Sequence, residues 1–362
     1  MNSTHIKYCT ITAGAIALAL GAAGCRSESD KPPVREQAPA TADRPSAGSP
    51  EAPDTATDSP SGAIAVDGAL PEYDAVSGIS GNLNSVGSDT LNNLMLLWGE
   101  DFRSIYPNVN VQVQGAGSST APAALIDGTA QLGPMSRAMT STEIDRFESR
   151  YGYKPTQIRV AIDALAVFVH RENPIDGLSL PKLDAIYSNT YRLGHEPIAN
   201  WGGAGLEGDW AQRPISLYGR NSVSGTYGFF KNVALGGGDF HGARYQEQPG
   251  SSTVVQSVGA DRYGIGYSGI GYATSGVRAI PIAQDEGEAL VDPTPENCIS
   301  GDYPLARFLY VYVNKNPRQP LDPLTYEFLR FINSRQGQEI VVRDGYFPLP
   351  AEAAEAALSQ IQ

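Results

Sequence analysis

Three short segments rich in glycine, serine and threonine stand at the starts of predicted helices. They are GSDTL at 87–91, GAGSST at 115–120 and SVSGT at 222–226. A helix N-terminus offers unpaired N–H groups and the positive end of the helix dipole. Hydroxyl groups add donors that can rotate, and glycine lets an anion approach the backbone. Three such turns facing one cleft predict a site for a tetrahedral oxyanion.

An arginine accompanies the third turn. Arg220 precedes Ser224 by four residues, and a guanidinium can donate two parallel hydrogen bonds to an oxyanion. Each turn taken alone is also explained by ordinary helix capping, because serine and threonine are preferred N-cap residues. The combination of three turns with an arginine favours anion binding over capping.

These segments resemble the periplasmic phosphate-binding proteins of phosphate ABC transporters. The similar strings are SVGSDTL at 85–91, AGSSTAPAALIDGTAQLGPMSRAMT at 116–140, YGRNSVSGTYGFF at 218–230 and GIGYSGIGYA at 264–273. The most specific of them is Arg-x-x-x-Ser-Gly-Thr at 220–226, and the resemblance covers about residues 80–350. It implies a two-lobed type II binding protein of the α/β class, with a hinge and a ligand cleft between the lobes.

The resemblance also implies a function and a set of ligand-binding residues. The protein would be a monomeric receptor without a cofactor or catalytic activity, which binds inorganic phosphate and delivers it to an ABC permease in the inner membrane. Thr90 and Ser118 would donate hydroxyls, Leu91 its backbone N–H, and Arg220 the charged contact. The full expected set is Ser88, Asp89, Thr90, Leu91, Ser118, Ser119, Ser136, Arg137, Arg220, Ser224, Gly225 and Thr226.

One position departs from the family pattern. Family members carry a carboxylate that accepts the proton of hydrogen phosphate, whereas this chain has Ser136 there, followed by Arg137. An acceptor left unpaired disfavours sulfate, which carries no proton. We hypothesise that Asp89 supplies the acceptor; the alternative is that Asp89 stabilises the dipole of the helix that follows it. Arg137 would either contact the ligand or its rim, or pair with a nearby acid.

Alternating strand and helix patterns position the three turns. Strands are predicted at 83–86, 109–114, 130–135, 158–170, 215–218, 265–267, 277–282 and 308–314. Helices are predicted at 90–106, 121–128, 141–151, 224–235, 324–334, 337–343 and 351–362. The alternation predicts an α/β fold with mostly parallel sheets, which bind ligands beyond the carboxyl ends of their strands. By the resemblance, lobe one would comprise 81–161 with 304–362, and lobe two 162–303.

The N-terminal residues predict export and a lipid anchor. The apolar run at 11–24 is short for a membrane span and ends in Ala22-Ala23-Gly24-Cys25. Small residues before a cysteine resemble a bacterial lipobox, so we expect a lipoprotein signal peptide at 1–24 and a lipid on Cys25. An ordinary signal peptide is the alternative. Residues 25–80 are predicted to be a disordered tether in the periplasm or cell envelope, with the folded part beginning near Gly81.

Composition excludes several other classes. The chain has 362 residues and a net charge of −13, which argues against binding nucleic acid. Its three cysteines form no disulfide framework, and we expect Cys298 to be a buried, inert thiol. The four histidines show no metal-site spacing, so no metal is expected. The GxGxxG match at 264–269 lacks a following amphipathic helix and predicts a glycine-rich strand and turn.

Two rival functions remain open at this stage. A metal-free phosphate-ester hydrolase would need His170, His195 or His241 to approach a serine in space. An oxyanion-binding sensor or scavenger lipoprotein would work without a transporter. The turns alone would also suit sulfate or molybdate, because only the resemblance singles out phosphate.

Overall fold

The computed structural model describes residues 64–362. The predicted signal peptide, the predicted lipidation at Cys25 and most of the predicted tether lie outside the described residues. Two large hydrophobic cores organise the rest, and we call the parts built on them lobe one and lobe two.

Lobe one contains a large core centred on Trp98, Phe102 and Phe328, and a smaller cluster around Leu125 and Phe147. Its elements are β1 (Gly81–Val86), α1 (Asn92–Ile105), β2 (Val109–Gln114), η1 (Ser118–Thr120), α2 (Ala121–Ile126), β3 (Gly133–Met135), α3 (Ser141–Tyr151), α9 (Pro323–Ile332), α10 (Arg335–Arg343) and α11 (Ala351–Ser359). The smaller cluster joins α2, β3 and α3. Strands β1 and β2 pair in parallel, as their separation by helix α1 requires.

Lobe two is built on a core that includes Tyr187, Trp201, Phe230 and Tyr267. Its elements are β5 (Leu178–Ser179), α4 (Leu180–Tyr187), α5 (Trp201–Ala204), η2 (Gly208–Trp210), β6 (Ser216–Arg220), α6 (Gly225–Ala234), β7 (Tyr245–Gln248), α7 (Ser251–Ala260), β8 (Gly264–Gly269), η3 (Ile270–Tyr272), β9 (Val277–Ile280), β10 (Ile282–Ala283) and α8 (Pro295–Ser300).

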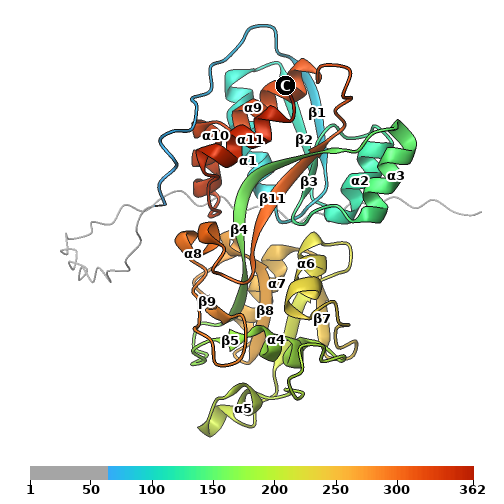
Figure 1. The fold of residues 1–362 in the computed structure, drawn as a ribbon. Helices are drawn as coiled ribbons and strands as arrows, with labels where there is room; N and C mark the ends of the chain where they lie inside the picture. Colours follow the sequence, from blue (N-terminus) through green and yellow to red (C-terminus); the bar gives the residue numbers. More distant parts are fainter. Residues whose placement is uncertain (1–63) are drawn as a thin grey trace, which may run out of the picture. The chain divides into compact units, whose positions relative to one another are not determined.

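Two long strands pass between the lobes. β4 (Thr156–His170) and β11 (Ala306–Val313) pair antiparallel and run side by side through both halves of the molecule in Figure 1. Along β4, Ile158, Val160 and Ala161 belong to the core of lobe one, whereas the large core of lobe two includes Ile162, Ala164, Leu165, Val167 and Val169. The predicted strands at 158–170 and 308–314 thus each contact both cores.

The α/β fold class is confirmed, but the prediction of mostly parallel sheets is wrong. The largest sheet has the order β3-β11-β4-β8-β6-β7, with β9 also pairing with β4. Strand β4 is antiparallel to β8, β9 and β11, while β6 is parallel to β7 and β8. The reason is the double crossing: a chain that enters lobe two along β4 and returns along β11 must run in opposite directions on the two strands.

Helix α7 was missed because its sequence suits a strand. The segment SSTVVQSVGA is rich in β-branched residues, which favour extended structure when burial is not considered. Helix α7 packs against β8, the glycine-rich strand predicted at 264–269. A Cβ on Gly266 would lie 2.6 Å from Val258, so glycine permits this close packing. Helices α4 and α8 were also not predicted.

The folded part begins before Gly81, so the predicted tether is too long. Leu70 is 2% exposed and belongs to the core of lobe two. The hydroxyl of Tyr73 lies 2.7 Å from that of Tyr106 and donates to Glu327 over 3.0 Å. Leu70 and Tyr73 can be buried because they pack against hydrophobic cores formed mainly by other segments.

The predicted burial of Cys298 is confirmed. Cys298 lies buried in α8 and is free, and burial raises the pKa of its thiol to about 12, as expected of an unreactive cysteine.

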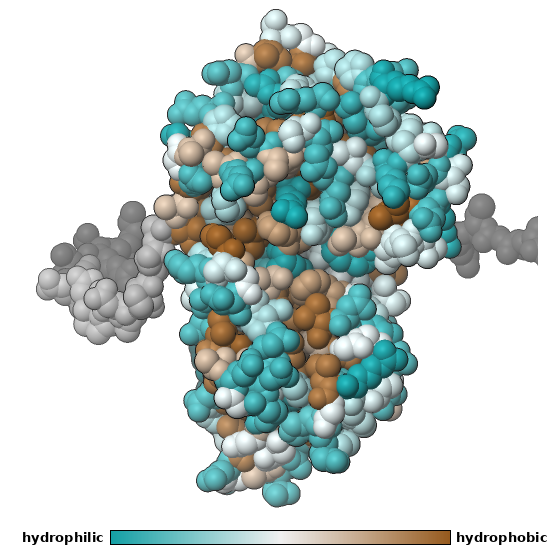
Figure 2. All heavy atoms as spheres, in the orientation of Figure 1, coloured by the Kyte–Doolittle hydropathy of each residue, from teal (hydrophilic) through white to brown (hydrophobic). Residues whose placement is uncertain are grey.

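Within residues 64–362, no helix combines the length and the apolar character needed to cross a membrane. Hydrophobic atoms are visible on the surface at the level where the two lobes meet (Figure 2).

The anchoring role of Tyr73 can be tested by substitution. Tyr73→Ala is expected to lower the free energy of unfolding by about 3–5 kcal/mol, because a large buried ring is removed. Tyr73→Phe keeps the ring and loses only the hydroxyl contacts, so it should cost about 1–2 kcal/mol. Urea unfolding of both variants measures the difference. An alanine variant as stable as the wild type would place residue 73 outside the folded part.

Candidate anion-binding site

Four buried hydroxyl side chains meet where the lobes contact each other. Thr90, Ser118 and Ser136 come from lobe one and Thr226 from lobe two, and each is at most 1% exposed. Thr90 Oγ1 lies 2.9 Å from Thr226 Oγ1, while Ser136 Oγ lies 3.3 Å from Ser118 Oγ and 3.5 Å from Thr226 Oγ1. We call these four residues the hydroxyl cluster. Rotatable O–H groups in this arrangement can all turn toward one anion.

Glycines let the backbone segments converge on the cluster. A Cβ on Gly87 would lie 2.1 Å from the carbonyl oxygen of Pro134, so a side chain there would push the first turn away from Ser136. A Cβ on Gly225 would lie 2.3 Å from Ser118 Oγ and 2.7 Å from Ser136 Oγ. Gly225 is the first residue of α6 in lobe two, so its missing side chain lets lobe two approach the hydroxyls of lobe one.

The predicted turns do begin helices or lie just before them. Ser224 is the N-cap of α6, and its Oγ accepts a hydrogen bond from the backbone N–H of Thr226 over 3.1 Å. Leu91 directly precedes α1, with its side chain in the core of lobe one. Ser88 is also buried, and its backbone N–H donates to the carbonyl of Pro134.

Arg220 and Asp89 form an ion pair that joins the lobes. Arg220 is buried, and its Nη1 lies 2.9 Å from Asp89 Oδ2 and 2.7 Å from Ser251 Oγ. The backbone N–H and the hydroxyl of Ser251 each donate to Asp89 Oδ2 over 2.8 Å. The carboxylate of Asp89 therefore contacts the N-terminus of α7 in lobe two. The helix that follows Asp89, α1, receives no side-chain hydrogen bond at its N-cap.

Two predicted residues are not brought into the hydroxyl cluster. The guanidinium of Arg137 makes two 2.7 Å contacts with Glu143, which is the expected pairing with a nearby acid. Burial acts to raise the pKa of Glu143, but the hydrogen bonds and charge of Arg137 prevail and lower it. The exposed side chain of Ser119 accepts from Arg137, and its backbone N–H donates to Val223 across the lobes.

A buried pair that was not predicted borders the cluster. Arg307 on β11 and Asp163 on β4 stand opposite each other in the strand register, and both are almost fully buried. Arg307 Nε and Nη2 donate to Asp163 Oδ2 over 2.9 and 2.7 Å, and Nη2 also donates to Thr226 Oγ1 over 3.1 Å. A signal was present in the sequence: Asp163 interrupts the apolar run VAIDALAVFV, and a buried carboxylate requires a partner.

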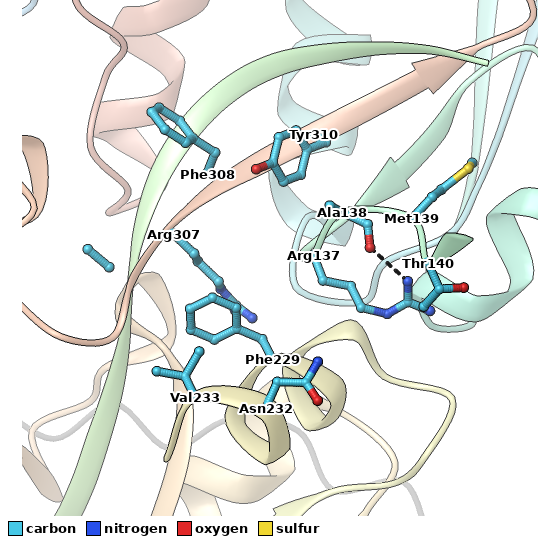
Figure 3. Close-up of a pocket in the computed structure, with 11 residues that line it drawn as sticks. Arg137, Ala138, Met139, Thr140, Phe229, Asn232, Val233, Arg307, Phe308 and Tyr310 are labelled. Atoms are coloured by element: carbon cyan, nitrogen blue, oxygen red, sulfur yellow. Dashed lines mark hydrogen bonds between the residues drawn. The ribbon is translucent and has the colours of Figure 1, made fainter. Parts of the chain in front are cut away.

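A cavity of about 540 Å³ is lined in part by Arg307, which also donates to Thr226 of the cluster. Phe229 and Val233 of α6, Phe308 and Tyr310 of β11, and Arg137 line it (Figure 3). The ring of Phe229 lies beside the guanidinium of Arg307, 5.4 Å from its central carbon, and helps to exclude water from that group. Arg137 thus lies on the rim of this cavity rather than in the cluster.

The histidines in the described residues make other contacts. His170 accepts from the backbone N–H of Glu172, His195 lies within hydrogen-bond distance of the carbonyl of Glu196, and His241 contacts the hydroxyl of Tyr191. No serine–histidine pair of the kind a hydrolase uses is found among these contacts. Across residues 64–362, histidine, cysteine and carboxylate side chains form no group that could hold a metal ion.

Comparisons with known proteins agree with this architecture. A family model described as a PBP superfamily domain matches residues 49–336. The phosphate-binding protein PstS of Pseudomonas aeruginosa is 57% identical over 302 residues, which cover 83% of this chain and 93% of the relative. A crystal structure of a putative phosphate ABC transporter substrate-binding protein with bound phosphate, from Clostridium perfringens, superposes with a TM-score of 0.62. That structure is 24% identical, and the match covers 74% of this chain and all of the other.

A phosphate transport receptor from Vibrio cholerae shares the fold as well, with a TM-score of 0.58 and 24% identity over 74% of this chain and all of the other. The two-lobed fold and the buried site between the lobes define the class of protein as a binding protein. The chain belongs to the PBP superfamily and, within it, to the family of the phosphate-binding proteins PstS.

The close approach at Gly225 generates a prediction. Gly225→Ala would place a methyl group against Ser118 and Ser136, so the lobes could not meet at the cluster, and we expect the affinity for a tetrahedral anion to fall about 10- to 100-fold. Thermal unfolding without an anion should shift modestly downward, because the methyl group overlaps Ser118 Oγ and Cβ in the arrangement seen here.

Gly228→Ala is the matched control for this experiment. It lies in the same helix, and its added Cβ would meet only the side chain of Arg137, at 3.4 Å or more. Isothermal titration with phosphate, arsenate and sulfate measures both variants. Equal affinities of the two variants would show that the anion does not bind at this contact.

Proposed function

We propose that the protein binds one inorganic phosphate ion at the hydroxyl cluster and delivers it to an ABC permease. The observation that carries the proposal is the convergence of four fully buried hydroxyls from both lobes, in a chain 57% identical to a protein named as phosphate-binding. The stability of the fold does not explain this cluster, because burying apolar side chains at these positions would cost less free energy than burying four hydroxyls.

The proposed contacts extend from the cluster to neighbouring donors. Thr90, Ser118, Ser136 and Thr226 exchange their mutual hydrogen bonds for bonds to phosphate oxygens. The N-terminus of α6 and the backbone N–H of Leu91 add donors and the positive ends of two helix dipoles. Arg220 supplies a charged donor through Nε, a buried atom with no hydrogen-bond partner within residues 64–362.

Binding is proposed to close the lobes on each other about β4 and β11. Lobe one comprises 81–161 with 304–362 and lobe two 162–303, with the segment from Leu70 to residue 80 packed onto both. Ligand groups on both lobes give phosphate a higher affinity for the closed arrangement, which is the condition for a ligand-driven hinge motion. The permease would then recognise the closed arrangement as the phosphate-bound form of the receptor.

The proposal places the protein outside the cytoplasm, held at a membrane by a lipid on Cys25, and assigns it no catalytic step. Delivery to a permease is tested in cells: a strain without this protein should lose uptake of micromolar labelled phosphate. Restoring the wild-type gene should restore uptake. Unchanged uptake in the deleted strain would favour a sensor or scavenger role instead.

Equilibrium binding tests the ligand itself. Full-length protein, stripped of phosphate with an enzymatic scavenger, is titrated with radiolabelled phosphate in the presence of competing anions. We expect saturable binding of one ion per chain, displaced by arsenate and not by excess sulfate. Absence of saturable binding, or equal displacement by sulfate, would overturn the assignment of phosphate.

Selectivity against sulfate is proposed to depend on Asp89. Its Oδ2 is held by Arg220 and Ser251, and we assign Oδ1 to the proton of hydrogen phosphate. Asp89→Asn should therefore weaken phosphate binding more than sulfate binding, narrowing their ratio of affinities by at least about tenfold. If Asp89 only holds the lobes together, both affinities fall by the same factor.

Asp101→Asn is the control for the loss of one carboxylate from the same lobe. Asp101 lies on α1 and pairs with Arg343 at the surface, 42% exposed. Its substitution should leave both affinities unchanged, because an exposed pair contributes little. Competition binding at several pH values between 6 and 8 gives the ratios for both variants.

A further inference from the structure

Arg307 has a donor that the protein leaves without an acceptor. Its side chain is 2% exposed, and its Nη1 is buried with no hydrogen-bond partner among the described residues. A guanidinium is a planar fork of five N–H groups. Leaving one of them buried and unpaired carries a desolvation penalty, so such an atom in a folded protein needs an explanation.

The planarity of the guanidinium fixes the direction of the unpaired N–H. One edge of the fork, Nε with one hydrogen of Nη2, faces Asp163 Oδ2. The second hydrogen of Nη2 points to Thr226 Oγ1, a member of the hydroxyl cluster. On a planar guanidinium that hydrogen runs parallel to a hydrogen of Nη1. The unpaired Nη1–H therefore points to the same side as Thr226, toward the cluster.

Asp163 holds the fork in this orientation. Its Oδ2 accepts two bonds from Arg307, and its Oδ1 accepts the backbone N–H of Ile270 over 3.1 Å. Asp163 is fully buried, so no water competes for these contacts. Phe229 covers one face of the guanidinium. The fork is thus preorganised before any ligand arrives, which is the arrangement that loses least entropy on binding.

We propose that Arg307 is a phosphate-binding residue and that Asp163 is its positioning residue. Nη1 of Arg307 donates to a phosphate oxygen beside Thr226. The inference rests on the proposed function and adds to it a second guanidinium from the strands that connect the lobes. Arg220 donates to the anion from lobe two, and Arg307 donates to it from β11. A bound phosphate is therefore hydrogen-bonded both to lobe two and to one of the two strands that connect the lobes.

The test removes the pair together. Substituting Arg307 alone by an apolar residue would leave the buried charge of Asp163 unpaired and would destabilise the fold. The double variant Arg307→Met with Asp163→Asn removes both charges at similar volume. We expect it to bind phosphate about 10- to 100-fold more weakly than the wild type, while its thermal midpoint without phosphate stays near the wild-type value.

A second variant covers the case in which the double variant does not fold. Arg307→Lys keeps a cation next to Asp163, so the fold retains its buried pair. A lysine cannot hold Asp163 in the side-on geometry and also extend a parallel donor to the anion. We expect at least about fivefold weaker phosphate binding with an unchanged thermal midpoint. A purely structural role of Arg307 would be rescued by lysine.

Arg159→Met is the matched control. Arg159 also lies on β4, but it is exposed and stacks over Phe308, so its loss should not change the affinity. All proteins are full-length, stripped of phosphate and titrated with inorganic phosphate. Wild-type affinity in the lysine variant, or in a folded double variant, overturns the inference while leaving the proposed function intact. Failure of the wild type itself to bind phosphate overturns the proposed function, and the inference falls with it.

Discussion

The burial of polar groups between two lobes is the constraint on which the rest of this structure depends. Hydroxyls, guanidinium groups and carboxylates are excluded from water at the cluster, so each must find a partner inside the protein or in a ligand. Arg220 pairs with Asp89, and Arg307 pairs with Asp163. Each positive charge is thereby balanced by a negative one. The hydroxyl cluster and the two ion pairs beside it consequently offer many hydrogen-bond donors with little local net charge.

The two crossing strands explain how such a site is assembled. β4 and β11 contribute residues to both cores and carry the Asp163–Arg307 pair at matching positions of the register. The remaining parts of the site come from turns at the ends of elements in the two lobes. Glycines at 87 and 225 remove the side chains that would otherwise hold these turns apart. The missing side chains at these turns and the two crossing strands together bring the hydroxyls within hydrogen-bond distance.

Much of this arrangement was predictable because it is encoded locally. The three glycine-, serine- and threonine-rich turns, the long apolar strand at 158–170 and the arginine before the third turn all leave short-range signals. The pairing of Arg307 with Asp163 joins residues 144 positions apart, so no local pattern shows it, although the lone acid in an apolar run was a clue. Helix α7 could not be predicted from local sequence, because its β-branched residues favour strands. Packing against Gly266 of β8 overrides that preference.

A crystal structure of the phosphate complex would show directly whether phosphate binds at the hydroxyl cluster. Protein stripped of phosphate would be crystallised with saturating phosphate and, in parallel, with arsenate to mark the position of the anion. We expect one tetrahedral anion with oxygens within about 3.2 Å of the hydroxyls of Thr90, Ser118, Ser136 and Thr226. An anion bound instead in the cavity beside Phe229, with the cluster hydroxyls still bonded to one another, would contradict it.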